Sequence, residues 1–98
     1  LQLFEKAMRY YSEAYQLAQQ EGIKFADPLS NLGNIYFKQG NYQRAVEFYN
    51  KALEIEREND NRLAMLSILT NIGATYAKAK MPAKAIENLN EAEKLAQE

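Results

Sequence analysis

The sequence predicts an all-α fold of five helices, and three observations carry this prediction. Apart from isoleucine, strand-forming β-branched residues are scarce, since valine occurs once and threonine twice in 98 residues. Apolar residues recur at steps of three and four along most of the chain, which is the period of an amphipathic helix. Four glycines and two prolines then divide the chain into segments of helical length.

The first two helices are delimited by a glycine and a proline. Residues 3–21 place apolar and polar side chains on opposite faces, which predicts the first helix. Gly22 is suited to end it, because glycine tolerates the left-handed backbone of a helix end. Asp27 before Pro28 is typical of an N-cap followed by proline at the first helical position. The second helix is therefore expected at 28–39.

Similar signals delimit the other three helices. Gly40 ends the second helix, and Asn41 is expected to cap the third. Asp60 or Asn61 is expected to cap the fourth helix, and Pro82 begins the fifth. The expected ranges are 42–58, 61–80 and 82 to at least 95. Because the connecting turns are short, neighbouring helices are expected to be antiparallel.

An internal repeat of 40 residues relates the second and third helices to the fourth and fifth. Glycine inside a helix costs about 1 kcal/mol, so its recurrence at Gly33 and Gly73 indicates a steric demand. Small residues at these positions let the two helices of a pair approach closely. The matching positions are Leu32, Gly33, Tyr36, Ala45, Tyr49 and Ala52, then Ile72, Gly73, Tyr76, Ala85, Leu89 and Ala92, with a half-copy at Ala7, Tyr11 and Ala14.

The composition excludes several classes of function. The chain has no cysteine and no histidine, which removes thiol catalysis, disulfides, structural zinc and imidazole acid–base chemistry. It also has no phosphate-binding glycine motif, so we expect no catalytic residue, no metal and no cofactor. Twelve basic against 13 acidic residues argue against nucleic-acid binding. No membrane-length apolar run or signal-peptide pattern occurs, so we expect no membrane partner and a cytoplasmic location.

These spacings resemble the tetratricopeptide repeat family, whose pattern is Leu-Gly-x-x-Tyr followed by small, aromatic and small residues. The resemblance covers nearly the whole chain and implies a right-handed superhelical stack of antiparallel helix pairs, an α-solenoid of about two and a half repeats. Leu29 and Leu69 stand where the family usually has tryptophan, and the period is 40 residues instead of about 34. The chain is expected to form one domain, divided into the second helix of a truncated repeat (1–24) and two full repeats (25–60 and 61–98).

The resemblance implies that the first helix of each pair lines a concave face that binds an extended peptide. Asn31 aligns with Asn71 there, and Lys38 aligns with Lys78. An asparagine amide can hydrogen-bond both the N–H and the C=O of a peptide unit, while lysines favour acidic side chains or a free carboxylate. The alternative is an ordinary solvated helix face. The candidate binding residues are Asn31, Asn34, Phe37, Lys38, Asn71, Ala74 and Lys78.

Two further alternatives concern this face. Phe37 is either an exposed anchor for an apolar ligand group or part of the wall between helix pairs, and helical spacing favours the wall.

The family also includes carboxylate-clamp repeats that hold chaperone C-termini. That clamp requires a lysine one turn before the asparagine, but Ser30 stands nearby, with Ser67 and Thr70 in the next copy. The clamp is therefore incomplete.

The leading hypothesis is a non-catalytic protein- or peptide-binding scaffold module, expected inside a larger signalling or regulatory protein because the chain begins at Leu1. The alternative is a structural, self-associating module without a groove ligand. An enzyme is expected only through further domains. A homodimer through the terminal helices is expected, because apolar residues surround over half of the first helix. Lys80 replaces Gly40, which predicts a strained hinge at 79–82.

Overall fold

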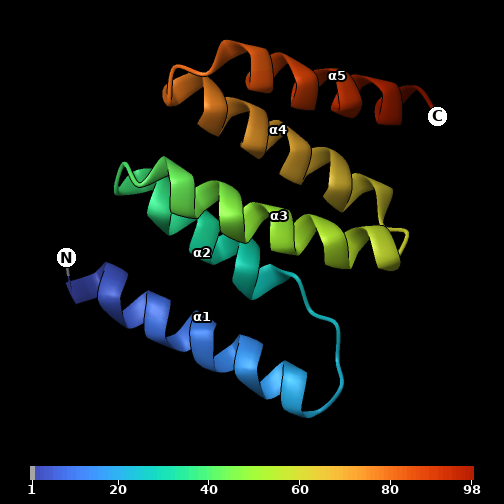
Figure 1. The fold of residues 1–98 in the computed structure, drawn as a ribbon. Coiled ribbons are helices and arrows are strands. Elements are labelled where there is room, and N and C mark those ends of the chain that lie inside the picture. The colour runs from blue at the N-terminus through green and yellow to red at the C-terminus, as the bar shows by residue number, and fades with distance from the viewer. Residues whose placement is uncertain (1) are drawn as a thin grey trace.

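Five α-helices, stacked in chain order, make up the computed structural model, which describes residues 2–98 (Figure 1). Each helix packs against the next one along the chain. The all-α prediction and the order of the helices are confirmed, and no strand occurs within residues 2–98. The helices are α1 (Gln2–Gln20), α2 (Asp27–Lys38), α3 (Tyr42–Glu58), α4 (Arg62–Lys78) and α5 (Pro82–Gln97).

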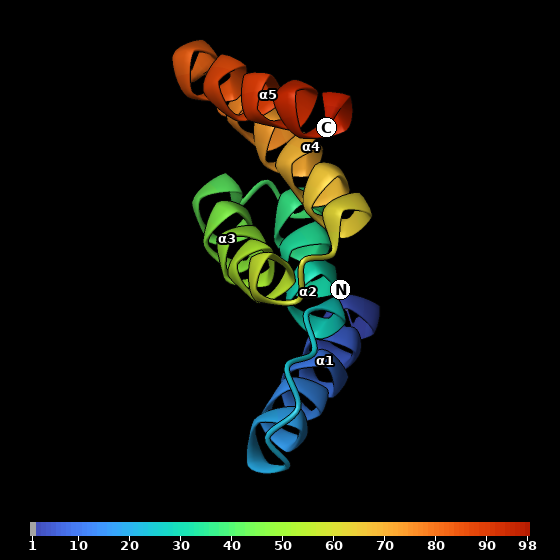
Figure 2. The same cartoon turned by 90° about the vertical axis from the view of Figure 1, so that its right-hand side faces the viewer.

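The side view shows how the pairs α2–α3 and α4–α5 follow one another. In Figure 2, α2 and the first part of α4 lie on one side of the stack, and α3 lies on the other. Over residues 2–98, no helix has both the length and the apolar character of a membrane-spanning segment.

Most of the helix ends lie where glycine and asparagine predict them. Gly22 and Gly40 have φ angles of 72° and 79°, the left-handed conformation that ends a helix. Asn41 caps α3, since its side chain accepts a hydrogen bond from the backbone N–H of Arg44 at 3.2 Å. Asn61 caps α4 in the same way.

Two aspartates are not N-caps, which corrects the sequence-based expectation. The N-cap of α2 is Ala26, and Asp27 is already inside the helix as its first residue. The reason is that Ala26 itself has a helical backbone, and its carbonyl accepts from the N–H groups of Leu29 and Ser30. Asp60 has a φ of 55° and occupies the left-handed position after α3, so Asn61 alone caps α4.

The turn between α4 and α5 is less favourable than the matching turn of the first repeat. Lys80 adopts a φ of 62° where Gly40 stands in the first copy, as the sequence predicts. A left-handed backbone costs a residue with a side chain roughly 1–2 kcal/mol. Met81 takes the N-cap position of Asn41, and α5 has no side-chain cap. The missing cap costs about 1 kcal/mol.

The core confirms the close approach that the small repeat residues predict. A Cβ atom built on Gly33 would lie 2.7 Å from the Tyr49 ring, and one on Gly73 would lie 2.7 Å from Leu89. Ala45 is fully buried between the same helices. The largest fully buried side chains are Leu29, Leu69, Ile72 and Thr75.

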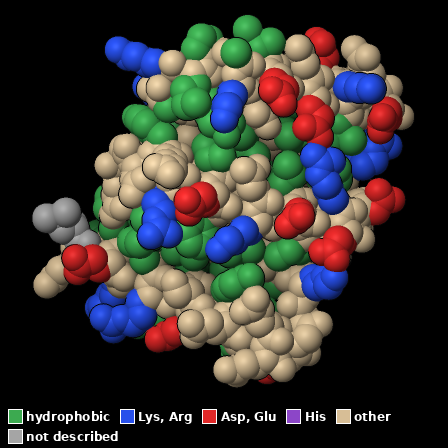
Figure 3. All heavy atoms as spheres, viewed as in Figure 1, with side chains coloured by type: hydrophobic (Ala, Val, Ile, Leu, Met, Phe, Trp, Pro, Cys, Tyr) green, Lys and Arg blue, Asp and Glu red, His purple; other side chains and the backbone are tan. Residues whose placement is uncertain are grey.

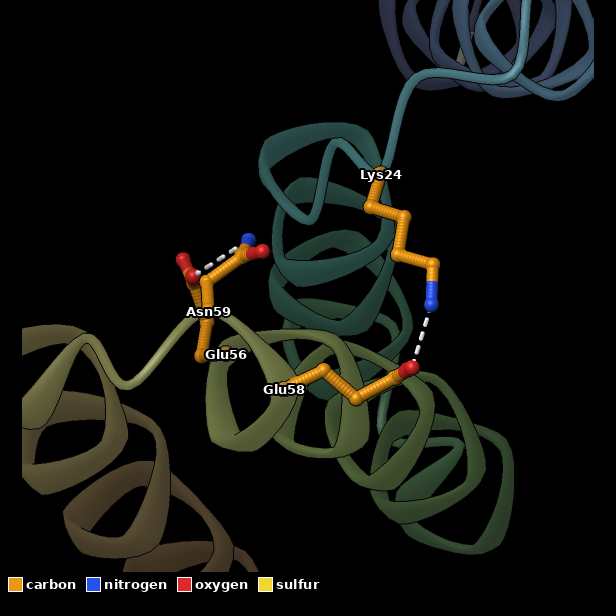
Figure 4. Close-up of polar contacts among 4 residues, drawn as sticks. All are labelled: Lys24, Glu56, Glu58 and Asn59. Atoms are coloured by element: carbon orange, nitrogen blue, oxygen red, sulfur yellow. Dashed lines mark hydrogen bonds and ion pairs between the residues drawn. The ribbon is translucent and has the colours of Figure 1, made fainter.

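Polar contacts at the end of α3 connect it to neighbouring segments (Figure 4). Lys24, in the loop between α1 and α2, forms an ion pair with Glu58. Both side chains are more than half exposed, so the pair contributes only about 0–1 kcal/mol. Glu56 is buried, and its Oε1 accepts a hydrogen bond from Nδ2 of Asn59 at 3.5 Å. Through Lys24 and Glu58, the loop after α1 is held to the α2–α3 pair.

Candidate functional site

The residues that the sequence analysis assigned to a binding face lie on α2 and α4, and we call the sides of these helices that carry them the outward face. Asn31, Asn34 and Lys38 lie at helical steps of three and four on α2, which places them on one side of that helix. The matching residues on α4 repeat the same steps. Asn34, Lys38, Ala74 and Lys78 are exposed, whereas Asn31 and Asn71 are half-buried.

Asn34 is held in place by the core of its own helix pair. The buried Tyr49 hydroxyl on α3 donates a hydrogen bond to Oδ1 of Asn34. Burial raises the pKa of Tyr49, so its hydroxyl stays protonated and remains a donor at neutral pH. Because the Asn34 oxygen is engaged, its amide nitrogen presents two N–H donors, which suits a ligand carbonyl or carboxylate.

Phe37 of α2 packs toward the core and against α3. Its ring is half-buried, packs against the core cluster, and meets the Tyr42 ring edge-on at a centroid distance of 5.6 Å. The Tyr42 contact lies within the α2–α3 pair, and the placement of Phe37 in a wall between helix pairs stays a prediction.

The second repeat reproduces only part of this arrangement. Ala74 stands in place of Asn34, and Leu89 stands in place of Tyr49, so the asparagine–tyrosine bond is absent from the second pair. Asn71 is retained, and the buried Thr75 hydroxyl donates to its backbone carbonyl at 2.7 Å. The two copies therefore share one asparagine and one lysine each, and the first copy adds Asn34.

Two surface hollows are lined by residues other than the candidate binding residues. One of about 450 Å³ lies where the first turns of α3 and α5 meet the last turn of α4. Another, of about 390 Å³, lies near Arg57 and Leu95, at the opposite ends of α3 and α5. Among residues 2–98, no acidic or histidine side chains gather in a group of three that could hold a metal ion.

This stack of helix pairs, with an outward face of polar side chains repeated at a fixed interval, defines a helical-repeat scaffold. The chain belongs to the tetratricopeptide repeat family, because the sequence model of that family matches residues 24–98. The resemblance to this family is thereby confirmed. The family is a non-catalytic, protein-interaction repeat fold.

Relatives share the repeat over short parts of their length. The chain is 40% identical over 58 residues to the human intraflagellar transport protein 88 homolog, covering 59% of this chain and 7% of that protein. It is 30% identical to a fission yeast DnaJ homolog subfamily C member 7 homolog over 89% of this chain and 20% of that protein. It is 36% identical to the photosystem I assembly protein Ycf3 of Synechococcus, over 76% of this chain and 39% of that protein. The chain therefore spans well under half the length of these relatives.

Two solved structures share the fold at low sequence identity. The N-terminal domain of stress-induced protein-1 from C. elegans superposes with a TM-score of 0.85 at 20% identity, covering 96% of this chain and 72% of that one. BtubC from P. vanneervenii superposes with a TM-score of 0.62 at 17% identity, covering 96% of this chain and 57% of that one. These matches confirm the stacked helix-pair fold.

Proposed function

We propose that this chain is a peptide-binding scaffold module, in which the outward face of α2 and α4, expected to be the concave face of the stack, holds an extended segment of a partner protein. The observation that carries the proposal is the recurrence of Asn31 as Asn71, and of Lys38 as Lys78, on that face at the repeat interval. The module serves within a larger, cytoplasmic signalling or regulatory protein, with 25–60 and 61–98 as its two full repeats.

The chemistry of the face indicates an extended ligand with negative charge. Asparagine side chains bind peptide backbone without regard to the ligand's sequence, so a row of them tolerates many side chains. Lys38 and Lys78 stand in the last turns of α2 and α4, and both are exposed. A carboxylate on the ligand would be attracted to either ammonium group.

Alanine substitution of the two aligned asparagines tests this function. Peptides selected from a displayed library against the full chain serve as probes, with affinity measured by fluorescence polarisation. Each hydrogen-bonding side chain contributes about 0.5–1.5 kcal/mol, so Asn31→Ala and Asn71→Ala should each weaken binding roughly 2- to 13-fold. The free energy of unfolding should change by less than ~1 kcal/mol.

Asn90→Ala is the matched control, since Asn90 is an exposed asparagine of α5 that is not among the candidate binding residues. Its affinity for the selected peptides should equal that of the unchanged chain. If the double variant Asn31→Ala/Asn71→Ala also binds with unchanged affinity, the proposed face is wrong.

A second candidate function is self-association through the terminal helices, and one observation favours it. Leu3, Tyr10 and Leu17 stand seven residues apart on α1 and are 82%, 60% and 54% exposed. Residues seven apart lie on the same side of a helix, so these three form one exposed apolar stripe along α1. On α5, Ile86 and Leu89 are also exposed, at 58% and 42%.

Sedimentation across a concentration series measures this association. We expect a dimer mass at tens of micromolar, which is the range of ordinary weak interfaces. The double variant Tyr10→Ser/Leu17→Ser should return the monomer, because it removes two members of the stripe. A monomer mass that persists into the hundred-micromolar range for the unchanged chain would count against the dimer.

A further inference from the structure

A surface hollow of about 450 Å³ lies beside the α4–α5 turn, and we name it the turn hollow. It lies on the left in Figure 1, where α3 begins, α4 ends and α5 begins. Val46 of α3, Tyr76 of α4 and Met81 of the turn provide apolar surface there, and Glu47 and Lys84 provide charge. The volume is in the range of ligand pockets, roughly 300–1,000 Å³.

The turn hollow is on a different side of α4 from the proposed peptide face. Tyr76 is two residues from both Ala74 and Lys78, and each residue turns an α-helix by about 100°. Tyr76 therefore lies about 160° around the helix from that face. A ligand in the turn hollow would leave Asn31 and Asn71 free to bind another segment.

Comparison with the first repeat shows that the apolar surface here replaces polar, stabilising residues. Asn41, which caps α3, is replaced by Met81, which leaves α5 without a side-chain cap and is 41% exposed. Gly40 is replaced by Lys80 at a positive φ. Sequences break such local rules mainly at functional sites, and methionine adapts its shape to apolar partners.

Tyr76 is the counterpart of Tyr36 in the second repeat, and the residue that would match the ring partner of Tyr36 is not aromatic. In the first repeat, Tyr36 stacks on Phe48 at a centroid distance of 5.4 Å. The position that matches Phe48 is Asn88, whose side chain donates to the carbonyl of Lys84. Nζ of Lys84 lies 5.6 Å from the Tyr76 ring centroid. The ring therefore keeps surface for an apolar ligand group beside a positive charge.

The charge around the turn hollow is positive. Glu47 forms an ion pair with Arg44 at 3.6 Å, which balances its charge. Without Lys38 and Lys78, which belong to the peptide face, segments 39–47 and 79–87 hold three basic and two acidic residues, whereas segments 51–62 and 91–98 at the other end hold four basic and seven acidic ones. In Figure 3, acidic side chains are correspondingly more frequent on the right than on the left.

We propose that the turn hollow binds one large apolar side chain, of leucine, methionine or phenylalanine size, presented by an acidic segment of a partner protein. The apolar walls of Val46, Tyr76 and Met81 would surround the anchor, and the surplus of lysine around them would attract the flanking carboxylates. An acidic segment with an apolar anchor fits both the apolar walls and the positive charge, whereas a neutral or basic segment fits only the apolar walls. The proposal stands apart from peptide binding by α2 and α4.

The test uses a short synthetic peptide of aspartates and glutamates with one central leucine, added to the full chain labelled with ¹³C at its methionine methyl groups. The chain has three methionines, and Met81 is exposed while Met65 is buried in the core. We expect the Met81 methyl resonance to shift and the Met8 and Met65 resonances to stay. The same peptide with alanine in place of leucine should bind at least about tenfold more weakly.

Met81→Asn separates binding from folding. It restores the residue that caps α3 in the first repeat, so it should raise the melting temperature while weakening the leucine peptide at least about fivefold. The double variant Asn31→Ala/Asn71→Ala should bind this peptide as the unchanged chain does, so the two binding proposals can fail separately.

Three results would overturn the proposal. Equal binding of the leucine and alanine peptides would show charge attraction alone. A peptide-induced shift confined to Met8 would place the contact on α1. A Met81 shift that grows with protein concentration in the absence of peptide would show that a second copy occupies the turn hollow.

Discussion

Replacing Gly33 with leucine is expected to destabilise the fold by about 1–3 kcal/mol or more, the usual cost of overpacking a core. A single Cβ atom on Gly33 would already lie 2.7 Å from a ring carbon of Tyr49. The ring is 2% exposed and its hydroxyl is bonded to Asn34, so it has little room to move. Urea unfolding followed by circular dichroism measures the loss.

Ala77→Leu is the control for this prediction, because Ala77 is exposed on α4 and the substitution creates the same side chain. It should change the free energy of unfolding by less than about 0.5 kcal/mol. The loss of stability for Gly33→Ala should lie between those for Gly33→Leu and Ala77→Leu. The clash of its added methyl group is partly offset by a gain in helix propensity of about 1 kcal/mol. Equal losses for Gly33→Leu and Ala77→Leu would mean that α2 and α3 do not pack through Gly33.

The helices could be predicted because their signals are local. Gly22, Gly40 and Asn41 act on the backbone of their own turns, and each does what the sequence predicts. The start of α2 could not be predicted to the residue. Ala26 is 3% exposed and packed into the core cluster, so tertiary contacts hold its backbone in the helical region. That shifts Asp27 from the cap position into the helix.

The candidate binding face could be predicted only as a row of positions. The interval of 40 residues aligned Asn31 with Asn71 in the sequence, but the bond from Tyr49 to Asn34 depends on how a buried ring packs across two helices. One sequence signal for this bond was present: Asn34 and Tyr49 both change in the second copy, to Ala74 and Leu89.

The turn hollow could be predicted only in part, because it depends on local sequence signals and on the packing of helices. The sequence shows the loss of Gly40 and Asn41 from the second copy, as Lys80 and Met81, and predicts strain at this turn. The volume of the hollow depends on how far the first turns of α3 and α5 diverge, and that is set by packing along both helices. Residue types alone could not give it.

Replacing Leu69 with alanine is expected to cost about 2–5 kcal/mol, the measured range for buried leucines in other cores. Leu69 stands where the family usually has tryptophan, is 0% exposed, and belongs to the core cluster that joins α2, α3, α4 and α5. Few domains have a free energy of unfolding above about 15 kcal/mol, so the variant should lose a large part of its total stability. The melting temperature should fall by about 4–8 °C for each kcal/mol.

Leu63→Ala removes the same atoms from the same helix, but Leu63 is 80% exposed, so its loss should stay below about 0.5 kcal/mol. Both variants are compared by the urea midpoint at an unchanged slope, which isolates stability from changes in the unfolded chain. The cost at Leu69 has two parts, the lost burial of the side chain and the cavity left between the repeats. A loss at Leu69 no larger than that at Leu63 would mean that the two helix pairs are not joined through this residue.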